Sequence, residues 1–110
     1  LAVEQTVVLE SDAAEARRIA RGFASGYLSS PNYSGNLRRM GYTAVDVSGS
    51  GSDRLIDAVI AWGDVDRITS RVREHLAAGA DHVCIQVIAA DDSDVCLEEL
   101  RELAPALLEL

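Results

Sequence analysis

The segment His82–Ile88 (HVCIQVI) most limits what this chain can fold into. It is an almost continuous apolar run, which is typical of a strand buried on both faces of a parallel sheet with a neighbour on each side. The chain offers one other clear strand pattern, Ala2–Leu9 (AVEQTVVL), which is rich in β-branched residues and ends at a helix-start signal. We therefore predict a parallel α/β sheet that needs more strands than these 110 residues supply.

Helical periodicity fills most of the remaining sequence. Asp12 is the predicted N-cap of a first helix that extends to about Leu28, with a glutamate three residues after the cap. Four further helices are predicted: Tyr33–Met40, residues 53–61, a helix from Asp64 to Gly79, and a final helix after residues 91–94 that Pro105 should kink or divide. Tyr42–Val47 has a strand-like composition but runs into a Gly/Ser-rich loop, and we predict an irregular segment there.

The order of these elements places a helix after each strand, which indicates a parallel βαβ relation with a right-handed crossover. Two strands cannot close a barrel, and a two-stranded parallel sheet leaves its edges uncovered. The chain also starts at Leu1, already in strand-like sequence. We therefore expect residues 1–110 to be the carboxyl-terminal part of a longer α/β domain, which alone would self-associate through its strand edges or be molten.

The charge balance excludes several classes of partner. Eighteen acidic residues against ten basic ones give a net charge of −8, which disfavours nucleic acid and membrane surfaces. No apolar run approaches the roughly 18–20 residues that span a bilayer, and no signal-peptide pattern is present. Cys84, in the apolar strand, and Cys96 form no CxxC pair, so we expect reduced thiols and a cytoplasmic location.

An ordered set of sequence blocks resembles the end of the bacterial luciferase-like family, in which a helix start leads into A-G-A-D-H-V and the last barrel strand. The matching blocks are residues 62–68 (WGDVDRI) and 76–87 (LAAGADHVCIQV). Residues 2–10, 31–33 and 38–42 look like the branch of that family that uses the deazaflavin coenzyme F-420. The chain departs from the family pattern at Asp64-Val65, where many relatives have Thr/Ser-Pro, although Asp64 can still cap the helix.

The resemblance implies that residues 1–110 are the seventh and eighth units of a single (β/α)8 barrel. The intact protein would be an oxidoreductase that transfers a hydride between coenzyme F-420 and a small organic substrate, and the chain alone would be inactive. Relatives use reduced FMN and oxygen as monooxygenases, and the choice stays open because most coenzyme-contacting positions of the family lie before Leu1. A reading of another class also stays open: a stand-alone, non-catalytic α/β interaction module that pairs its strand edges with a partner or in a homodimer.

Barrel enzymes place function at the carboxyl ends of their strands and in the loops that follow. This rule points to residues 9–12 and 88–94, and to residues 29–52 as an insertion with the character of a lid. The candidate substrate-facing residues are Tyr33, Asn36, Arg38, Arg39 and Tyr42, which offer hydrogen bonds and positive charge. In the alternative interpretation the tyrosines pack the short helices and the arginines are solvated.

Three polar residues interrupt the apolar strands: Glu4, Gln5 and Gln86. A buried polar group without a partner costs about 1–3 kcal/mol, so each should have one if it is buried. They either line the barrel interior beneath the coenzyme ring or belong to a hydrogen-bonded core network. No spacing indicates a Ser-His-Asp or Cys-His set, so the catalytic and coenzyme-binding residues are not assigned.

The sequence predicts no metal site. His75 and His82 are the only histidines, whereas zinc needs three or four converging ligands. We expect His75 to face solvent near a helix end. Residues 91–94 lack the spacing of a calcium loop, and residues 49–52 (GSGS) lack the lysine of a phosphate loop, so we interpret them as a solvated turn and a flexible linker. Trp62 is expected to bury its ring against helices.

Overall fold

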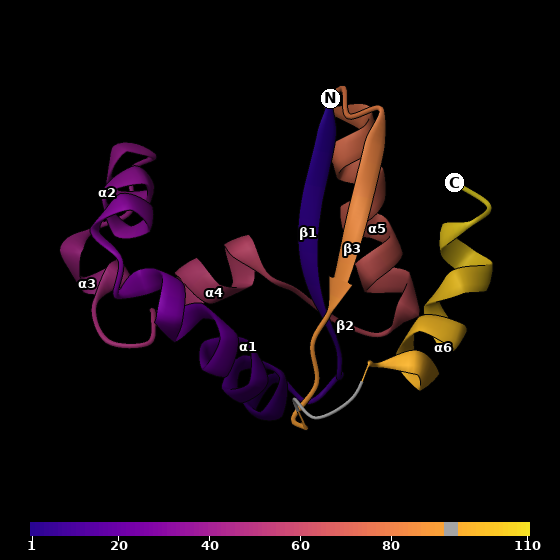
Figure 1. Cartoon of the computed structure of the whole chain (residues 1–110), viewed down its shortest axis with the longest axis horizontal. Helices are drawn as coiled ribbons and strands as arrows, with labels where there is room; N and C mark the ends of the chain where they lie inside the picture. The colour runs from indigo at the N-terminus through magenta and orange to yellow at the C-terminus, as the bar shows by residue number, and fades with distance from the viewer. Residues whose placement is uncertain (92–94) are drawn as a thin grey trace.

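A computed structural model describes residues 1–91 and 95–110 of the chain, whose helices surround one small parallel sheet (Figure 1). In chain order the elements are β1 (Ala2–Leu9), α1 (Ala13–Leu28), α2 (Pro31–Arg39), α3 (Ala44–Val47), α4 (Asp53–Val59), β2 (Ala61–Gly63), α5 (Val65–Ala77), β3 (His82–Val87) and α6 (Leu97–Leu107). No helix in the described part of the chain is long and apolar enough to cross a bilayer.

β1 is the central strand of the sheet, whose order is β2-β1-β3 and whose strands are all parallel. β3 pairs with β1 from Ala2↔His82 to Val7↔Val87, whereas β2 pairs only with the last three residues of β1. Helices connect each strand to the next, as parallel pairing requires. The predicted parallel arrangement with helical connections is therefore confirmed.

Strand β2 is absent from the sequence prediction, which places one helix over residues 53–61. In the structure α4 ends at Val59, and Ile60 is already extended at φ −119° and ψ 123°. All three residues of β2 are buried, and they pair with the end of β1, far away in the sequence. Long-range pairing thus ends a helix that the local apolar pattern would continue.

The prediction that His82–Ile88 is buried on both faces is wrong for the described residues, which supply one of the two neighbouring strands that the pattern indicates. β3 pairs there only with β1, and its residues alternate between exposed and half-buried. Ile85 and Val87 pack against the core under α5 and α6. His82, Cys84 and Gln86 are exposed on the opposite face, because successive side chains of a strand alternate.

Two apolar clusters lie on opposite sides of β1. On one side Val7 packs with Ile68 of α5 and Leu103 of α6. On the other side Val8 and Trp62 pack with the small-residue stripe of α1, which is Ala16, Ala20 and Ala24. Small side chains let α1 come close to its neighbours, so the carboxyl half of β1 is covered on both faces.

The predicted helix ends are largely confirmed. Asp12 caps α1 by accepting the Glu15 N–H at 3.0 Å, and Asp64 caps α5 by accepting the Arg67 N–H at 2.9 Å. Gly79 follows α5 with a φ of 109°, the left-handed conformation that glycine adopts without strain. α6 is not divided at Pro105 but continues to Leu107.

Residues 29–52 form two short helices, α2 and α3, at the far end of α1 (Figure 1). α1 starts beside the carboxyl end of β1, so these helices stand away from the edge where barrel enzymes place their sites. Residues 42–47 are not irregular as predicted, because Thr43 and Asp46 form a capping box that starts α3. These local hydrogen bonds outweigh a strand-like composition.

The fold is therefore an α/β arrangement with a three-stranded parallel sheet and six helices in the described residues. A (β/α)8 barrel follows chain order around the sheet, whereas the order here is β2-β1-β3. The neighbouring pair β1–β3 is compatible with two successive barrel strands, but the barrel itself goes beyond these observations.

Candidate ligand-binding cleft

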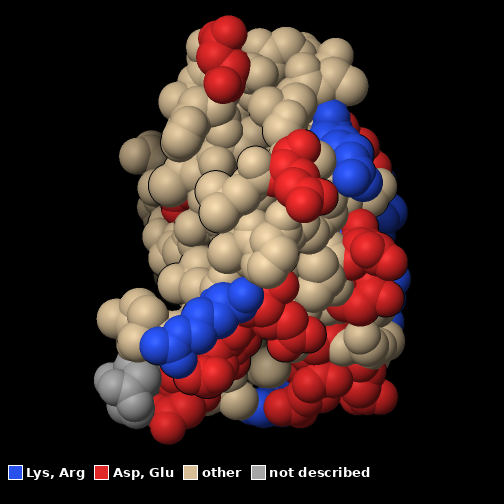
Figure 2. Space-filling model, turned by 90° about the vertical axis from the view of Figure 1, so that its right-hand side faces the viewer, with Lys and Arg blue, Asp and Glu red and all other residues tan. Residues whose placement is uncertain are grey.

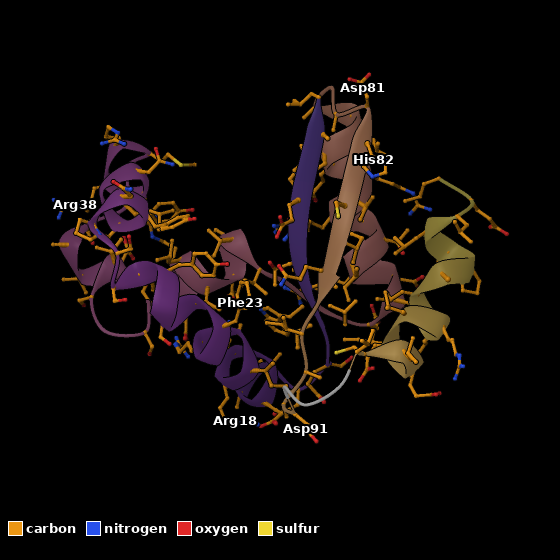
Figure 3. The ribbon with its side chains drawn as sticks, viewed as in Figure 1. Arg18, Phe23, Arg38, Asp81, His82 and Asp91 are labelled. Carbon is orange, nitrogen blue, oxygen red and sulfur yellow. The ribbon has the colours of Figure 1, made fainter. Side chains whose placement is uncertain are left out.

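A cleft of about 380 Å³ lies between helices α1, α2 and α4 and the middle of β1. We call it the aromatic cleft, and it is lined by Glu4, Thr6, Phe23, Ala24, Tyr27, Leu28, Tyr33, Asn36, Leu37, Val59 and Ile60. Phe23 lies between the short helices and the sheet, whereas Arg38 lies on the far side of α2 (Figure 3). The volume falls in the range of sites for small organic ligands.

Three aromatic rings in contact form one wall of the aromatic cleft. Phe23 and Tyr27 are four residues apart, which places them on one face of α1, and their ring centroids are 5.1 Å apart. Tyr33 of α2 meets Tyr27 edge-on, with centroids 4.9 Å apart and an interplanar angle of 85°. Edge-to-face packing of this kind is favourable for aromatic pairs. The wall is thus fixed by contacts between two helices.

Polar groups enter the aromatic cleft from β1 and α2. Glu4 and Thr6 lie two residues apart on one face of β1, and Asn36 comes from α2. Through the strand register Glu4 stands beside Cys84 and Thr6 beside Gln86. We call the set Glu4, Thr6, His82, Cys84 and Gln86 the polar strand face; it adjoins the aromatic cleft through its first two members.

The five predicted substrate-facing residues divide into two groups. Tyr33 and Asn36 line the aromatic cleft. Arg38 and Arg39 are exposed and do not line it. Tyr42 packs against the core beside α1 and lies under the Arg54 guanidinium, 4.7 Å from its ring centroid. The structure therefore brings two of the five together and separates the other three from them.

The sequence analysis does not predict Phe23 and Tyr27 as cleft residues, and it gives Glu4 only as a possible residue of a barrel interior. The 3- and 4-residue spacing of the rings was available, but it also fits a buried helix stripe. Tyr27 is in fact 44% exposed and Phe23 is half-buried. Only the position of α2 shows that this stripe faces a cleft.

The polar strand residues have different environments. Gln5 is buried, and it donates to the carbonyls of Thr6 and Val59 at 2.8 and 3.2 Å. Its Oε1 lies 2.8 Å from Nε2 of His75, so His75 is half-buried against β1 and not solvent-facing as predicted. Gln5 thus belongs to a core network, whereas Glu4 and Gln86 are exposed.

A second cavity, of about 240 Å³, lies beside Trp62. The predicted burial of Trp62 is confirmed; its Nε1 donates to Asp57 at 2.8 Å, and the Arg67 guanidinium lies 4.3 Å from its ring centroid. Two hydrogen bonds from Arg17 to the Asp57 carboxylate, at 2.9 and 2.7 Å, chiefly lower the pKa of Asp57, and burial opposes them. This carboxylate is already satisfied within the fold, so we interpret the network as structural.

The carboxyl ends of β1 and β2 border an acid-lined depression of about 390 Å³, formed with Glu98, Glu99 and Glu102 of α6. Acidic side chains gather over the lower part of this side of the molecule (Figure 2). Across residues 1–91 and 95–110, no group of three His, Cys, Asp or Glu side chains is placed to hold a metal ion. Of the predicted turn at 91–94, residues 92–94 lie outside the described chain.

The Gly/Ser loop before α4 is tied to its surroundings and is not a free linker. Ser52 caps α4 by accepting the Leu55 N–H and also donates to Asp46 at 2.7 Å. The Gly51 carbonyl accepts from Arg21 at 3.1 Å. The start of α4 is therefore occupied by the chain's own groups.

Comparison with known proteins gives no relative: no family model, no curated protein and no solved structure matches the chain. The class that fold and cleft define is an α/β protein with a small parallel sheet and an aromatic, mildly acidic cleft beside it. A more particular assignment is a matter of proposal.

Proposed function

We propose that this chain forms the carboxyl-terminal β-α units of a luciferase-like (β/α)8 oxidoreductase, which transfers a hydride between coenzyme F-420 and a small organic substrate. The observation that carries the proposal is the polar strand face. One face of the β1–β3 pair packs against α5 and α6, while the other presents Glu4, Thr6, His82, Cys84 and Gln86, the first two in the cleft that α1, α2 and α4 enclose. Barrel strands likewise pack helices against their outer face and turn alternate side chains toward the barrel interior.

The free strand edges support the same proposal. Among the described residues β3 has no second neighbour, and β1 pairs with β2 only at its last three residues. Exposed edges of this length are normally paired or covered. In the proposed barrel a preceding strand would pair with the amino-terminal half of β1, and the first strand of the barrel would pair with β3.

The ordered sequence blocks supply the coenzyme assignment. They span nearly the whole chain, and the blocks at 31–33 and 38–42 resemble those of the F-420 branch. FMN is the second candidate coenzyme, in a monooxygenase of the same family.

The test uses the full-length gene product, with any residues that are encoded before Leu1. We expect fluorescence titration to give micromolar binding of coenzyme F-420 and weaker binding of FMN. Micromolar binding of FMN without binding of F-420 would identify FMN as the coenzyme in place of F-420. Binding of neither coenzyme would refute the proposed oxidoreductase. An in-frame start codon directly before Leu1 would favour the second candidate, an interaction module, which the unpaired edge of β3 supports.

A further inference from the structure

We propose that the aromatic cleft binds a small organic cation: an amine carried on an aromatic body. The inference goes beyond the proposed oxidoreductase, because the site consists wholly of described residues of this chain and needs no coenzyme. It rests on three observations, namely the aromatic wall, the charge at the opposite wall and the size of the cleft.

The aromatic wall suits both parts of such a ligand. Phe23, Tyr27 and Tyr33 form a continuous ring surface, and Tyr27 and Tyr33 are 44% and 53% exposed. Exposed ring faces attract cations because the quadrupole of the ring is negative above its plane. The apolar lining also covers a ring of the ligand, as in most small-molecule sites.

Glu4 supplies the charge that selects a cation. It is the only charged side chain among the described residues that line the aromatic cleft. In the described structure no hydrogen bond or ion pair engages its carboxylate. The arginines nearest in sequence to the cleft residues are committed or remote: Arg21 pairs with Asp53, and Arg38 lies on the far side of α2. An ammonium group would therefore find a carboxylate partner, and a carboxylate ligand would not find a cation.

The size of the cleft is sufficient for a single ring system with a short chain. About 380 Å³ accommodates a phenyl or indole ring that carries an aminoethyl group. Asn36 and Thr6 add hydrogen-bonding groups beside Glu4. The arrangement is thus complementary to an arylalkylamine.

The experiment compares three matched probes: phenethylammonium, 2-phenylethanol and 3-phenylpropionate. The chain is labelled with 3-fluorotyrosine, and ¹⁹F NMR follows each titration. Its three tyrosines give an internal control, since Tyr27 and Tyr33 line the cleft and Tyr42 does not. We expect the cation to bind about tenfold more tightly than the alcohol, with shifts at Tyr27 and Tyr33 only, and the anion to bind least.

Two variants separate charge from shape. Glu4→Gln should bring the cation and the alcohol to within about twofold, whereas Glu109→Gln, an equal charge change at the far end of α6, should leave the tenfold preference unchanged. Tyr33→Leu should weaken both ligands. Equal binding of all three probes, a cation preference that survives Glu4→Gln, or shifts that include Tyr42 would each overturn the inference. Coenzyme titration is a separate readout, so the proposed function and this inference fail independently.

Discussion

Asp46 joins the two ends of the segment between α2 and α4. Its carboxylate accepts from the backbone and hydroxyl of Thr43, from Ser52 at 2.7 Å and from Arg54 at 2.6 Å. The Arg54 hydrogen bond, followed by those from Ser52 and Thr43, holds the pKa of Asp46 well below its ordinary value, against the opposing effect of burial. The ionised form of Asp46 is therefore the one that the fold stabilises.

This pKa shift predicts how stability depends on pH. A carboxyl whose pKa is lower in the folded state contributes stability above its unfolded pKa, about 3.9, and loses it as the pH falls through the folded value. We expect Asp46→Asn to lower the urea midpoint at pH 7, and the difference from wild type to shrink below about pH 4. Glu102→Gln, at an exposed position of α6, is the control and should change the urea midpoint little at either pH. A midpoint difference that is the same at pH 7 and pH 2.5 would contradict the prediction.

Gln5 links β1 to α5 and α4 through its side-chain amide. Replacement with alanine removes the partner of His75 and of the Val59 carbonyl. We expect Gln5→Ala to lower the free energy of unfolding by about 1–3 kcal/mol, because buried polar groups lose their hydrogen bonds. Gln86→Ala, on the exposed face of β3, should stay within about 0.5 kcal/mol in the same urea titration. Equal effects of the two variants would show that the Gln5 network contributes nothing.

At the scale of elements, α6 is held mainly by one residue. Leu103 is fully buried against Val7 and Ile68, whereas Leu97 at the start of the helix and Leu108 directly after it are 53% and 85% exposed. We expect Leu103→Ala to cost about 2–5 kcal/mol, because it leaves a cavity between α6 and the sheet. Hydrogen exchange should show the loss of amide protection first in α6.

The control for this prediction is Leu108→Ala, which removes an exposed side chain directly after the same helix. It should change the free energy of unfolding by less than about 0.5 kcal/mol. If Leu103→Ala leaves the exchange rates of α6 unchanged, Leu103 is not what docks the helix.

The helices and strands differ in how far local sequence predicts them. α5 has a capping aspartate, an apolar stripe and a terminal glycine, all of which act within a few residues, and its bounds agree with the prediction. β2 has no such local signal, since Ala61–Gly63 is extended only because it pairs with the end of β1. α3 depends on a four-residue capping box that strand-like composition concealed.

For the whole molecule, one edge of β3 has no partner strand among residues 1–91 and 95–110, and this predicts self-association of the 110-residue chain. Unpaired parallel edges expose rows of backbone N–H and C=O groups that can pair with another copy. We expect sedimentation velocity to show dimers or larger species at about 100 μM, where edge pairing is favoured by mass action.

Charge placed on the edge strand should reduce this association. We expect Cys84→Lys, at an exposed position of β3, to shift the population toward monomer. Ser70→Lys, at an exposed position of α5, should leave the population unchanged. A sharp, dispersed amide spectrum from a monodisperse wild-type monomer would refute edge pairing.

The sequence predicts only some of the residues that line the aromatic cleft. Tyr33 and Asn36 lie in a long excursion between strands, which predicts that they face a substrate, and both line the aromatic cleft. Arg38, Arg39 and Tyr42 share that excursion but not the cleft, because a helix distributes neighbouring residues around its axis. Which face of α2 meets α1 depends on ring contacts between helices, and these have no signature within either segment.

By itself, the sequence determined the parallel strands β1 and β3, the long helices and their caps, since these follow from periodicity and from hydrogen bonds within one or two turns. The tertiary structure alone decided that β3 lies at an edge of the sheet, that β2 exists and that α1 and α2 enclose a cleft against β1. These features depend on contacts between segments distant in the chain. Strand pairing and packing between distant segments depend on context, and they do not produce a periodic pattern in the local sequence.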